Sequence, residues 1–203
     1  MKTEQEQFWQ GRFGSNYIDR NKSDELLSAN IHFFSQVIAR TVGVKGILEL
    51  GCNVGMNLRA LKGIKPSYEL TGVDINQDAI NQVMEWGGAE AISGSILDLQ
   101  LDKTFDLTFT KGVLIHINPD KLQDVYHTLY SHSNRYILVA EYYNPTPVSI
   151  EYHGEKDKLF KRDFAGELLD RYTDLRLVDY GFLYKRDVNF PQDDISWFLM
   201  EKI

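Results

Sequence analysis

A hydrophobic run that meets two glycines and then a helix-like segment constrains the fold of this chain more than any other feature. The run Gly46-Ile47-Leu48-Glu49-Leu50 leads into Gly51 and Gly55. Glycines at such a strand-to-helix turn let the main chain approach a ligand where any Cβ would collide. The spacing Gly-x-x-x-Gly is neither the Gly-x-Gly-x-x-Gly of dinucleotide sites nor a Lys-Ser/Thr phosphate loop. The turn therefore predicts a ligand without a pyrophosphate, and a generic strand-to-helix connection is the alternative.

A carboxylate follows the next strand at the same edge of the expected sheet. The strand Leu70-Thr71-Gly72-Val73 ends in Asp74, about twenty residues after the glycine turn. A carboxylate at the carboxyl end of this neighbouring strand can accept hydrogen bonds from two ribose hydroxyls. Together the two features favour a nucleoside ligand that carries no phosphates.

Hydrophobic periodicity predicts alternating helices and short buried strands, which is typical of an α/β fold. Strands this uniformly apolar are covered on both faces, as in a parallel sheet with helical crossovers. No crossover helix fits between the last two strands, so that pair should be antiparallel. We expect a Rossmann-like, doubly wound, mostly parallel seven-stranded sheet with one antiparallel strand near the C-terminus. The predicted strands include 46–50, 70–74, 105–109, 136–140, 176–182 and 195–201, and the predicted helices are 24–41, 55–62, 76–86, 120–131 and 161–172.

Composition narrows the class of protein. A chain of 203 residues fits one domain over 1–203. A net charge of −7 argues against a nucleic-acid partner. No apolar run is long enough to span a membrane, and the N-terminus has no secretory pattern. The single cysteine, Cys52, excludes an intramolecular disulfide, and the histidines show no metal-ligand spacing. We therefore expect a cytoplasmic protein without a metal, while its oligomeric state stays open.

The segment Glu49-x-Gly51-x-x-x-Gly55 followed by Asp74 resembles motifs I and II of the class I S-adenosylmethionine (SAM) methyltransferases. The resemblance covers most of the chain and implies SAM as the cofactor. In that family the glycine loop passes under the methionine part of SAM and the acid after the second strand holds the ribose. The residues that this implies as cofactor ligands are Glu49, Gly51, Asn53, Gly55, Asp74 and Ile75.

Two further segments resemble motifs of the same family. Ser93-Gly94-Ser95-Ile96-Leu97 is similar to the segment that frames the adenine, which implies contacts from Ser95 and Ile96, although the family often has Asp where this chain has Ser95. The run 105–119 resembles motif IV of small-molecule methyltransferases. That likeness implies that Lys111 and Val113 flank SAM and that His116 points towards the acceptor.

A narrower resemblance extends from end to end. Phe8-Trp9-x-x-x-Phe13-Gly14-x-x-Tyr17-x-x-Arg20-Asn21, the run 111–120, and segments 141–147 and 158–164 look like the pseudaminic acid biosynthesis-associated methylases. The name of that family records an association with an acidic sugar and does not establish an acceptor. The implied partner is a small polar molecule such as a sugar or nucleotide sugar.

Other residues are candidates by position. Tyr142 and Asn144 follow the fifth strand, where they could orient an acceptor or the methionine end of SAM. Residues 1–41 could form a helical lid in which Tyr17 or Arg20 reaches the carboxylate of SAM, and core packing is the alternative reading of the Trp9, Phe13 and Tyr17 stripe. We interpret 155–163 as a mixed-charge loop and helix start, and a site for an anionic small molecule is the alternative. The connection 183–194 should leave its strand at the edge where ligands bind, although Gln192 and Asp193 read more readily as a solvated loop than as site residues.

The sequence thus favours a SAM-dependent methyltransferase that aligns its methyl donor with an acceptor. His116 is the candidate base for an acceptor hydroxyl, because imidazole can take a proton near neutral pH, and a structural histidine is the alternative. Two rival hypotheses keep the SAM site. One is a lyase or cyclase that acts on the aminocarboxypropyl chain and releases methylthioadenosine, and the other is a non-catalytic SAM-binding protein.

Overall fold

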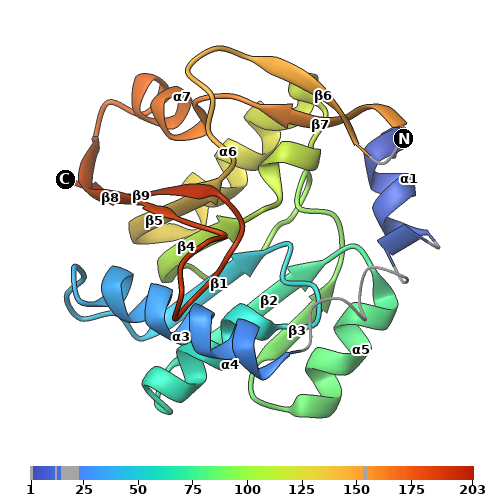
Figure 1. The fold of residues 1–203 in the computed structure, drawn as a ribbon. Helices are drawn as coiled ribbons and strands as arrows, with labels where there is room; N and C mark the ends of the chain where they lie inside the picture. Colours follow the sequence, from blue (N-terminus) through green and yellow to red (C-terminus); the bar gives the residue numbers. More distant parts are fainter. Residues whose placement is uncertain (1, 12, 15–22, 153–154) are drawn as a thin grey trace.

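The computed structural model describes residues 2–11, 13–14, 23–152 and 155–203, and its centre is a seven-stranded sheet (Figure 1). The strand order is β3-β2-β1-β4-β5-β9-β8. Neighbours from β3 to β5 are parallel, whereas β9 is antiparallel to both β5 and β8. The predicted fold class is confirmed. The strands of this sheet are β1 (Gly46–Leu50), β2 (Glu69–Asp74), β3 (Glu90–Ser93), β4 (Phe105–Lys111), β5 (Ser133–Glu141), β8 (Leu175–Leu183) and β9 (Ile195–Lys202).

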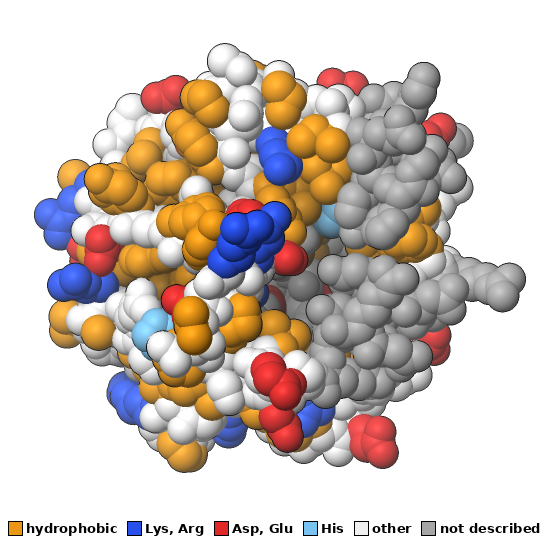
Figure 2. Space-filling model, in the orientation of Figure 1, with side chains coloured by type: hydrophobic (Ala, Val, Ile, Leu, Met, Phe, Trp, Pro, Cys, Tyr) orange, Lys and Arg blue, Asp and Glu red, His pale blue; other side chains and the backbone are white. Residues whose placement is uncertain are grey.

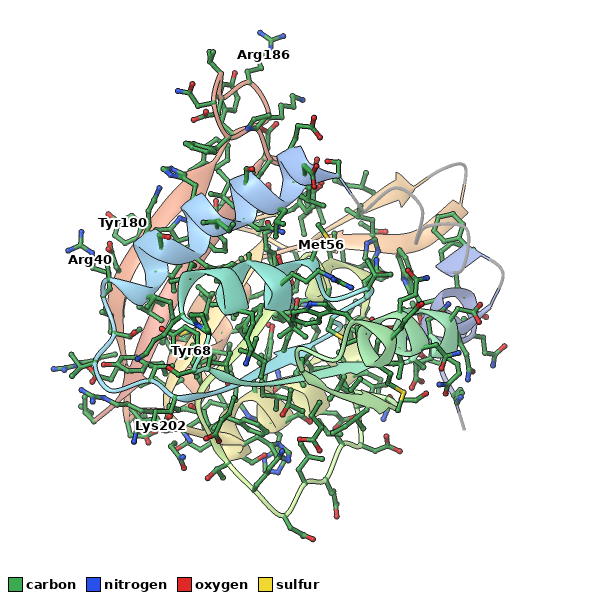
Figure 3. The ribbon with its side chains drawn as sticks, turned by 90° about the horizontal axis from the view of Figure 1, so that it is seen from below. Arg40, Met56, Tyr68, Tyr180, Arg186 and Lys202 are labelled. Carbon is green, nitrogen blue, oxygen red and sulfur yellow. The ribbon has the colours of Figure 1, made fainter. Side chains whose placement is uncertain are left out.

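Alternation along the strands separates two cores. Ile47 of β1 packs on the face that α3 and α4 cover, and Leu48 packs on the opposite face with α6 and α7. Figure 3 shows α3 and α4 side by side across the first face. The two cores place the parallel strands between layers, so polar groups of these strands can reach a ligand only at their ends. The helices are α1 (Glu4–Gln10), α3 (Asp24–Ile38), α4 (Met56–Ile64), α5 (Gln77–Trp86), α6 (Leu122–Ser131) and α7 (Phe164–Arg171), with short 3₁₀ turns η1 (Leu114–His116) and η2 (Pro119–Lys121).

Caps explain where helices differ from the prediction. The helix predicted over 24–41 ends at Ile38, because Arg40 and Thr41 donate main-chain hydrogen bonds to carbonyls three residues back. The helix predicted over 161–172 begins at Phe164, because the Asp163 carboxylate caps it by accepting from the Gly166 N–H at 2.8 Å.

The interpretation of residues 155–163 as a loop and helix start is wrong. Strands β6 (Val148–Tyr152) and β7 (Glu155–Lys161) form an antiparallel hairpin after β5. Four consecutive charged residues, 155–158, hid the strand, and Leu159 packs in the same core as Leu114 and Ile115 of η1. An isolated hairpin is marginal in water, so this packing against the domain is what stabilises it.

The outer strand β8 leaves an apolar strip uncovered, in the region of the sheet edge where Figure 2 shows hydrophobic side chains. Tyr180, Phe182 and Tyr184 are exposed, and the Tyr180 ring stacks on Phe198 with centroids 6.3 Å apart. On the other face an ion pair of 2.8 Å joins Asp179 to Arg40, which Figure 3 labels beside Tyr180. In the described part of the chain, no helix is both long and apolar enough to cross a membrane.

The N-terminal helix α1 is fixed by a capping box. The Thr3 hydroxyl accepts from the Glu6 N–H at 3.1 Å, and the Glu6 carboxylate accepts from the Thr3 N–H at 2.7 Å. The helix ends at Gln10 before Gly11, so the expected aromatic stripe is broken there, although Trp9 and Phe13 still meet edge to face at 5.4 Å. Tyr17, the third member of that stripe, lies outside the described residues.

Candidate functional site

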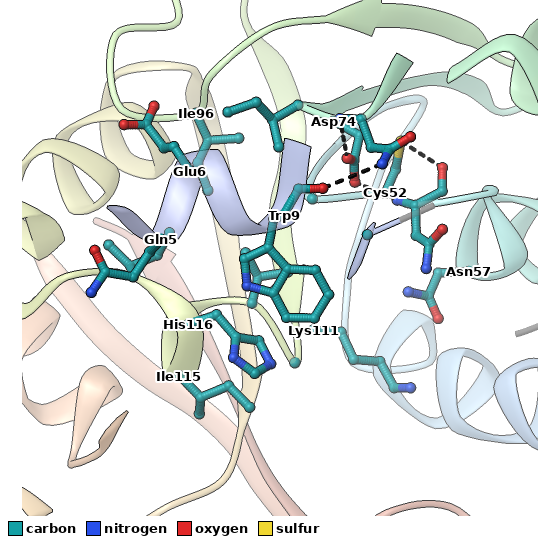
Figure 4. A pocket seen from close by; sticks show the side chains of 18 of the residues that line it. Gln5, Glu6, Trp9, Cys52, Asn57, Asp74, Ile96, Lys111, Ile115 and His116 are labelled. Carbon is teal, nitrogen blue, oxygen red and sulfur yellow. Dashed lines mark hydrogen bonds between the residues drawn. The ribbon is translucent and has the colours of Figure 1, made fainter. Parts of the chain in front are cut away.

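A cavity of about 330 Å³ opens at the carboxyl ends of the parallel strands. Ligand sites in open α/β sheets lie at this edge, because the segments that leave neighbouring strands diverge there. The walls come from α1, from the segments after β1 to β5, from α3, from Leu159 of β7 and from the β8–β9 connection. Figure 4 shows α1 crossing the cavity, with Trp9 at its centre.

The glycine turn forms the floor of the cavity. Gly51 and Gly55 both have φ of +78°, a left-handed conformation that favours glycine. A Cβ on Gly51 would lie 2.5 Å from Cγ2 of Val113, so the turn after β4 packs directly on the Gly51 main chain. Asn53, between the two glycines, is also left-handed, with φ of +47°. Glycine is therefore needed at position 51 because the Val113 side chain, in the turn after β4, occupies the space that a Cβ would take. The sequence analysis gave only the approach of a ligand to the main chain as the reason.

Asp74 ends β2 beside this turn. Its Oδ2 accepts from the Asn53 N–H and its Oδ1 from the Asn76 N–H, each at 2.8 Å. Burial raises the pKa of the Asp74 carboxyl, and these main-chain donors oppose that rise. Each oxygen keeps a second acceptor position, so the carboxylate can still receive hydrogen bonds from a diol.

Ile75, Ser95 and Ile96 line the next part of the cavity, as the sequence predicts. The Ser95 hydroxyl, however, donates to Oε1 of Glu6 on α1 at 2.6 Å. Ser95 therefore contacts the N-terminal helix, a long-range partner that no local pattern reveals.

A buried group of charges lies under the glycine turn. Glu49 is fully buried; its Oε1 accepts from Asn57 at 2.6 Å, and its Oε2 has no hydrogen-bond partner among the described residues. Burial raises the pKa of Glu49 to about 8, against the effect of Asn57 and the nearby Lys111 ammonium. Burial lowers the pKa of Lys111, whose Nζ donates to Asn30 at 3.4 Å. Lys111 lines the cavity as predicted, and in Figure 4 it extends away from His116.

Glu141, at the end of β5, fixes the turn that carries His116. Its Oε1 accepts from the N–H groups of Val113 and Leu114, each at 2.9 Å. These N–H groups lie at the start of η1, where they have no carbonyl partner within the turn. Burial raises the pKa of Glu141 to about 7, opposed by these donors. Val113 and His116 both line the cavity, and the His116 ring lies 4.5 Å from that of Trp9 between centroids.

The remaining predicted residues divide into two groups. Tyr142 lines the cavity, with the Lys161 ammonium 5.0 Å from its ring centroid. Asn144 is not among the lining residues, and its amide donates to the Thr146 carbonyl at 2.5 Å. Tyr17 and Arg20 lie outside the described residues.

The β8–β9 connection contributes residues that the sequence analysis undervalued. Reading Gln192 and Asp193 as a solvated loop is wrong for Gln192, which is buried, and both line the cavity. The Gln192 amide donates to the Ala29 carbonyl at 2.9 Å, a contact across 163 positions of sequence. The topology indicates this placement, because the connection leaves β8 at the edge of the sheet where the parallel strands end.

The raised pKa of Glu49 predicts a pH dependence of folding. The folded chain holds the Glu49 proton up to about pH 8, whereas the unfolded chain releases it near 4.5. Protonation of Glu49 therefore stabilises the folded chain fully below pH 4.5, and this stabilisation is lost as the pH rises towards 8. Above about pH 8 Glu49 is ionised in both states, and its contribution no longer changes with pH. Between about pH 7 and 8 the free energy of unfolding should fall by roughly 1 kcal/mol, as measured by urea titration, and the fall should be smaller in Glu49→Gln. The exposed Glu69→Gln is the matched control, and equal slopes in all three proteins would contradict the assignment.

Part of the chain matches a known protein family. A family model described as a methyltransferase domain matches residues 47–135, which run from β1 into β5 and include the glycine turn, Asp74 and His116. A search among curated proteins gave no match.

Solved structures share the fold over nearly the whole chain. Magnesium protoporphyrin IX methyltransferase from Synechocystis PCC 6803, with S-adenosylhomocysteine (SAH) bound, has a TM-score of 0.70 at 13% identity, covering 98% of this chain and 97% of that one. The amino pentose methyltransferase CalS10 from Micromonospora echinaspora, with SAM bound, has a TM-score of 0.66 at 10% identity, covering 95% and 97%. The glycopeptide N-methyltransferase MtfA, complexed with SAM, has a TM-score of 0.62 at 12% identity, covering 84% and 86%. Residues 47–135 thus match a methyltransferase domain, and the chain shares its fold with solved methyltransferases that have SAM or SAH bound.

Proposed function

We propose that the chain transfers the SAM methyl group to a small polar, sugar-related acceptor, with His116 as the base that takes the acceptor proton. The observation that carries this proposal is the His116 imidazole in the cavity wall, on a turn that the Glu141 carboxylate holds in place. The sugar-related acceptor is supported by the narrow sequence resemblance to pseudaminic acid-associated methylases. It is also supported by the likeness in fold to an amino pentose methyltransferase.

The described residues fit SAM. Gly51 lines the cavity beside Asp74, whose carboxylate has acceptor positions for the ribose. Glu49 lies buried beneath the turn, and its Oε2 has no hydrogen-bond partner among the described residues. The apolar Ile75 and Ile96 suit the adenine. When bound, SAM supplies a methyl group made electrophilic by the sulfonium.

On the acceptor side, the residues orient the nucleophile and remove its proton. In the transfer, the acceptor oxygen or nitrogen forms a bond to the methyl carbon, the sulfur–carbon bond breaks, and its electron pair stays on sulfur to give SAH. The proton of the nucleophile goes to the imidazole of His116. Tyr142 and Leu159 line the same cavity and can orient the acceptor.

Residues 1–41 act as an N-terminal extension to the single methyltransferase domain, with α1 as a lid. This part of the proposal is supported by Gln5, Glu6 and Trp9, which line the cavity from above. The roles suggested for Tyr17 and Arg20, as ligands of the SAM carboxylate, remain part of the same proposal. A lid that excludes water favours methyl transfer to the acceptor over side reactions.

Product analysis tests the reaction. Incubated with SAM alone, the protein should leave SAM almost intact, because transfer needs an acceptor beside the donor. With a panel of amino sugars, hydroxylated sugars and nucleotide sugars, we expect SAH and a methylated acceptor in equal amounts by mass spectrometry. Stoichiometric methylthioadenosine from SAM alone would instead establish a lyase or cyclase reaction.

Asp74→Asn should weaken SAH binding about 10- to 100-fold, because hydrogen bonds to a charged group contribute roughly 1.5–3 kcal/mol. Calorimetric titration gives the affinity, and circular dichroism checks the fold. Asp78→Asn, an exposed acid on the first turn of α5, is the matched control and should bind as the wild type does. Unchanged affinity in a folded Asp74→Asn protein would rule out Asp74 as the ribose ligand.

His116→Ala should lower kcat about 10²- to 10⁴-fold while SAH affinity stays nearly unchanged, because a general base acts on the acceptor and not on the cofactor. Initial rates of SAH formation with the acceptor found above provide the measurement. His127→Ala, an exposed histidine on α6, is the control. A His116→Ala protein that is less stable but turns over at the wild-type rate would assign His116 a structural role only.

A further inference from the structure

Glu6 brings a carboxylate to the lining of the cavity from an unexpected element. Among the described residues that line the cavity, Glu6, Asp74 and Asp193 carry carboxyl groups. Asp74 ends β2 and Asp193 lies in the β8–β9 connection, whereas Glu6 comes from α1. Figure 4 shows Glu6 beside Ile96, on the opposite side of Trp9 from Asn57.

The hydrogen bonds of Ser95 and Glu6 show which of the two side chains can still accept a hydrogen bond from a ligand. The Ser95 hydroxyl gives its one hydrogen to Glu6 Oε1, and it accepts from the Leu97 N–H at 3.1 Å. Ser95 therefore has no hydrogen left to donate. Glu6 Oε2 accepts from the N–H and the hydroxyl of Thr3, at 2.7 and 3.0 Å. Oε1 receives only the Ser95 hydrogen among the bonds described, so it retains an acceptor position.

The negative charge of Glu6 means that it accepts hydrogen bonds from a ligand and donates none. Burial alone would raise the pKa of the Glu6 carboxyl, but hydrogen bonds from Ser95 and Thr3 and the charge of Lys2 bring it below its usual value. Glu6 is therefore an ionised group that only accepts hydrogen bonds at neutral pH. Between apolar walls such as Ile75 and Ile96, a flat aromatic base would meet this acceptor at its edge.

We propose that Glu6 recognises the adenine of SAM, with Oε1 accepting a hydrogen bond from the exocyclic amine and Ser95 holding the carboxylate in position. This rests on SAM as the cofactor. Related enzymes often have Asp at the position of Ser95, and here the carboxylate is supplied by α1 instead. The cofactor thus bridges the sheet edge and the N-terminal helix, which couples docking of α1 to occupancy of the site.

The variant Glu6→Gln separates recognition from folding of the helix. A glutamine at this position keeps the capping box, because its amide oxygen can accept from the Thr3 N–H. Its NH₂ group then faces the Ser95 hydroxyl and the adenine amine. Because the NH₂ group and the amine are both hydrogen-bond donors, the hydrogen bond to the adenine is lost. SAH should bind about 10- to 100-fold more weakly in calorimetric titration. The exposed Glu4→Gln removes the same charge from the same helix and should bind SAH as the wild type does.

A base analogue tests the atom contacted. S-inosylhomocysteine carries an oxygen in place of the adenine amine, and the wild type should bind it far more weakly than SAH. In Glu6→Gln this preference should shrink at least tenfold, because the glutamine NH₂ can donate to that oxygen. Adding Ser95→Asp to Glu6→Gln should restore both the affinity for SAH and its preference over S-inosylhomocysteine. The new carboxylate at position 95 can accept the hydrogen bond from the adenine amine.

Hydrogen exchange over residues 4–10 gives a readout of α1 docking. SAH should slow exchange there in the wild type and in Glu4→Gln, but much less in Glu6→Gln at equal occupancy. Wild-type affinity and preference in Glu6→Gln would overturn the proposal while leaving the cofactor assignment intact. A wild-type protein that binds no SAH would instead overturn the cofactor assignment itself.

Discussion

The left-handed turn at Gly51 is the constraint on which the rest of the site depends. Because Gly51 lacks a Cβ, Val113 packs directly on its main chain, which brings the end of β4 against the end of β1. The Gly51 N–H donates to the Val73 carbonyl at 2.8 Å, and the Asn53 N–H donates to Asp74, so the same turn is tied to β2. Glu141 ties Val113 in turn to β5. A Cβ at position 51 would displace Val113, to which Glu141 at the end of β5 is bonded.

Buried charge is concentrated at the site, where it costs folding free energy. Glu49 and Lys111 are removed from water in the same region, and burial shifts the pKa of each towards its neutral form. Glu141 is also buried, but its cost is offset by main-chain donors that need an acceptor at the start of η1. A fold that needed only stability would place apolar groups at these positions. Their presence beneath the glycine turn and in the cavity wall supports the proposal that they serve a ligand.

The sequence predicted the sheet because its strands leave local patterns, and the same patterns placed candidate residues at the carboxyl edge of the sheet. Strand β1 was predicted with the bounds that it has, and Asp74 followed from the end of β2. What could not be predicted depends on contacts across long stretches of chain. The bond from Gln192 to Ala29 and the bond from Ser95 to Glu6 leave no periodic signal in the sequence. The β6–β7 hairpin was missed because its charges resemble those of a loop, and its stability comes from packing against η1.

The reversed direction of β9 has a consequence for how such a protein can diversify. Because β9 runs against β8, the connection between them returns to the cavity at the edge where the parallel strands end. This connection and the β6–β7 hairpin are insertions between strands on one half of the sheet, whereas Gly51 and Asp74 belong to the other half. Mutations that remodel the two insertions can therefore alter one wall of the cavity without disturbing the glycine turn. Descendants of one ancestral domain can acquire new acceptors while inheriting the same methyl donor.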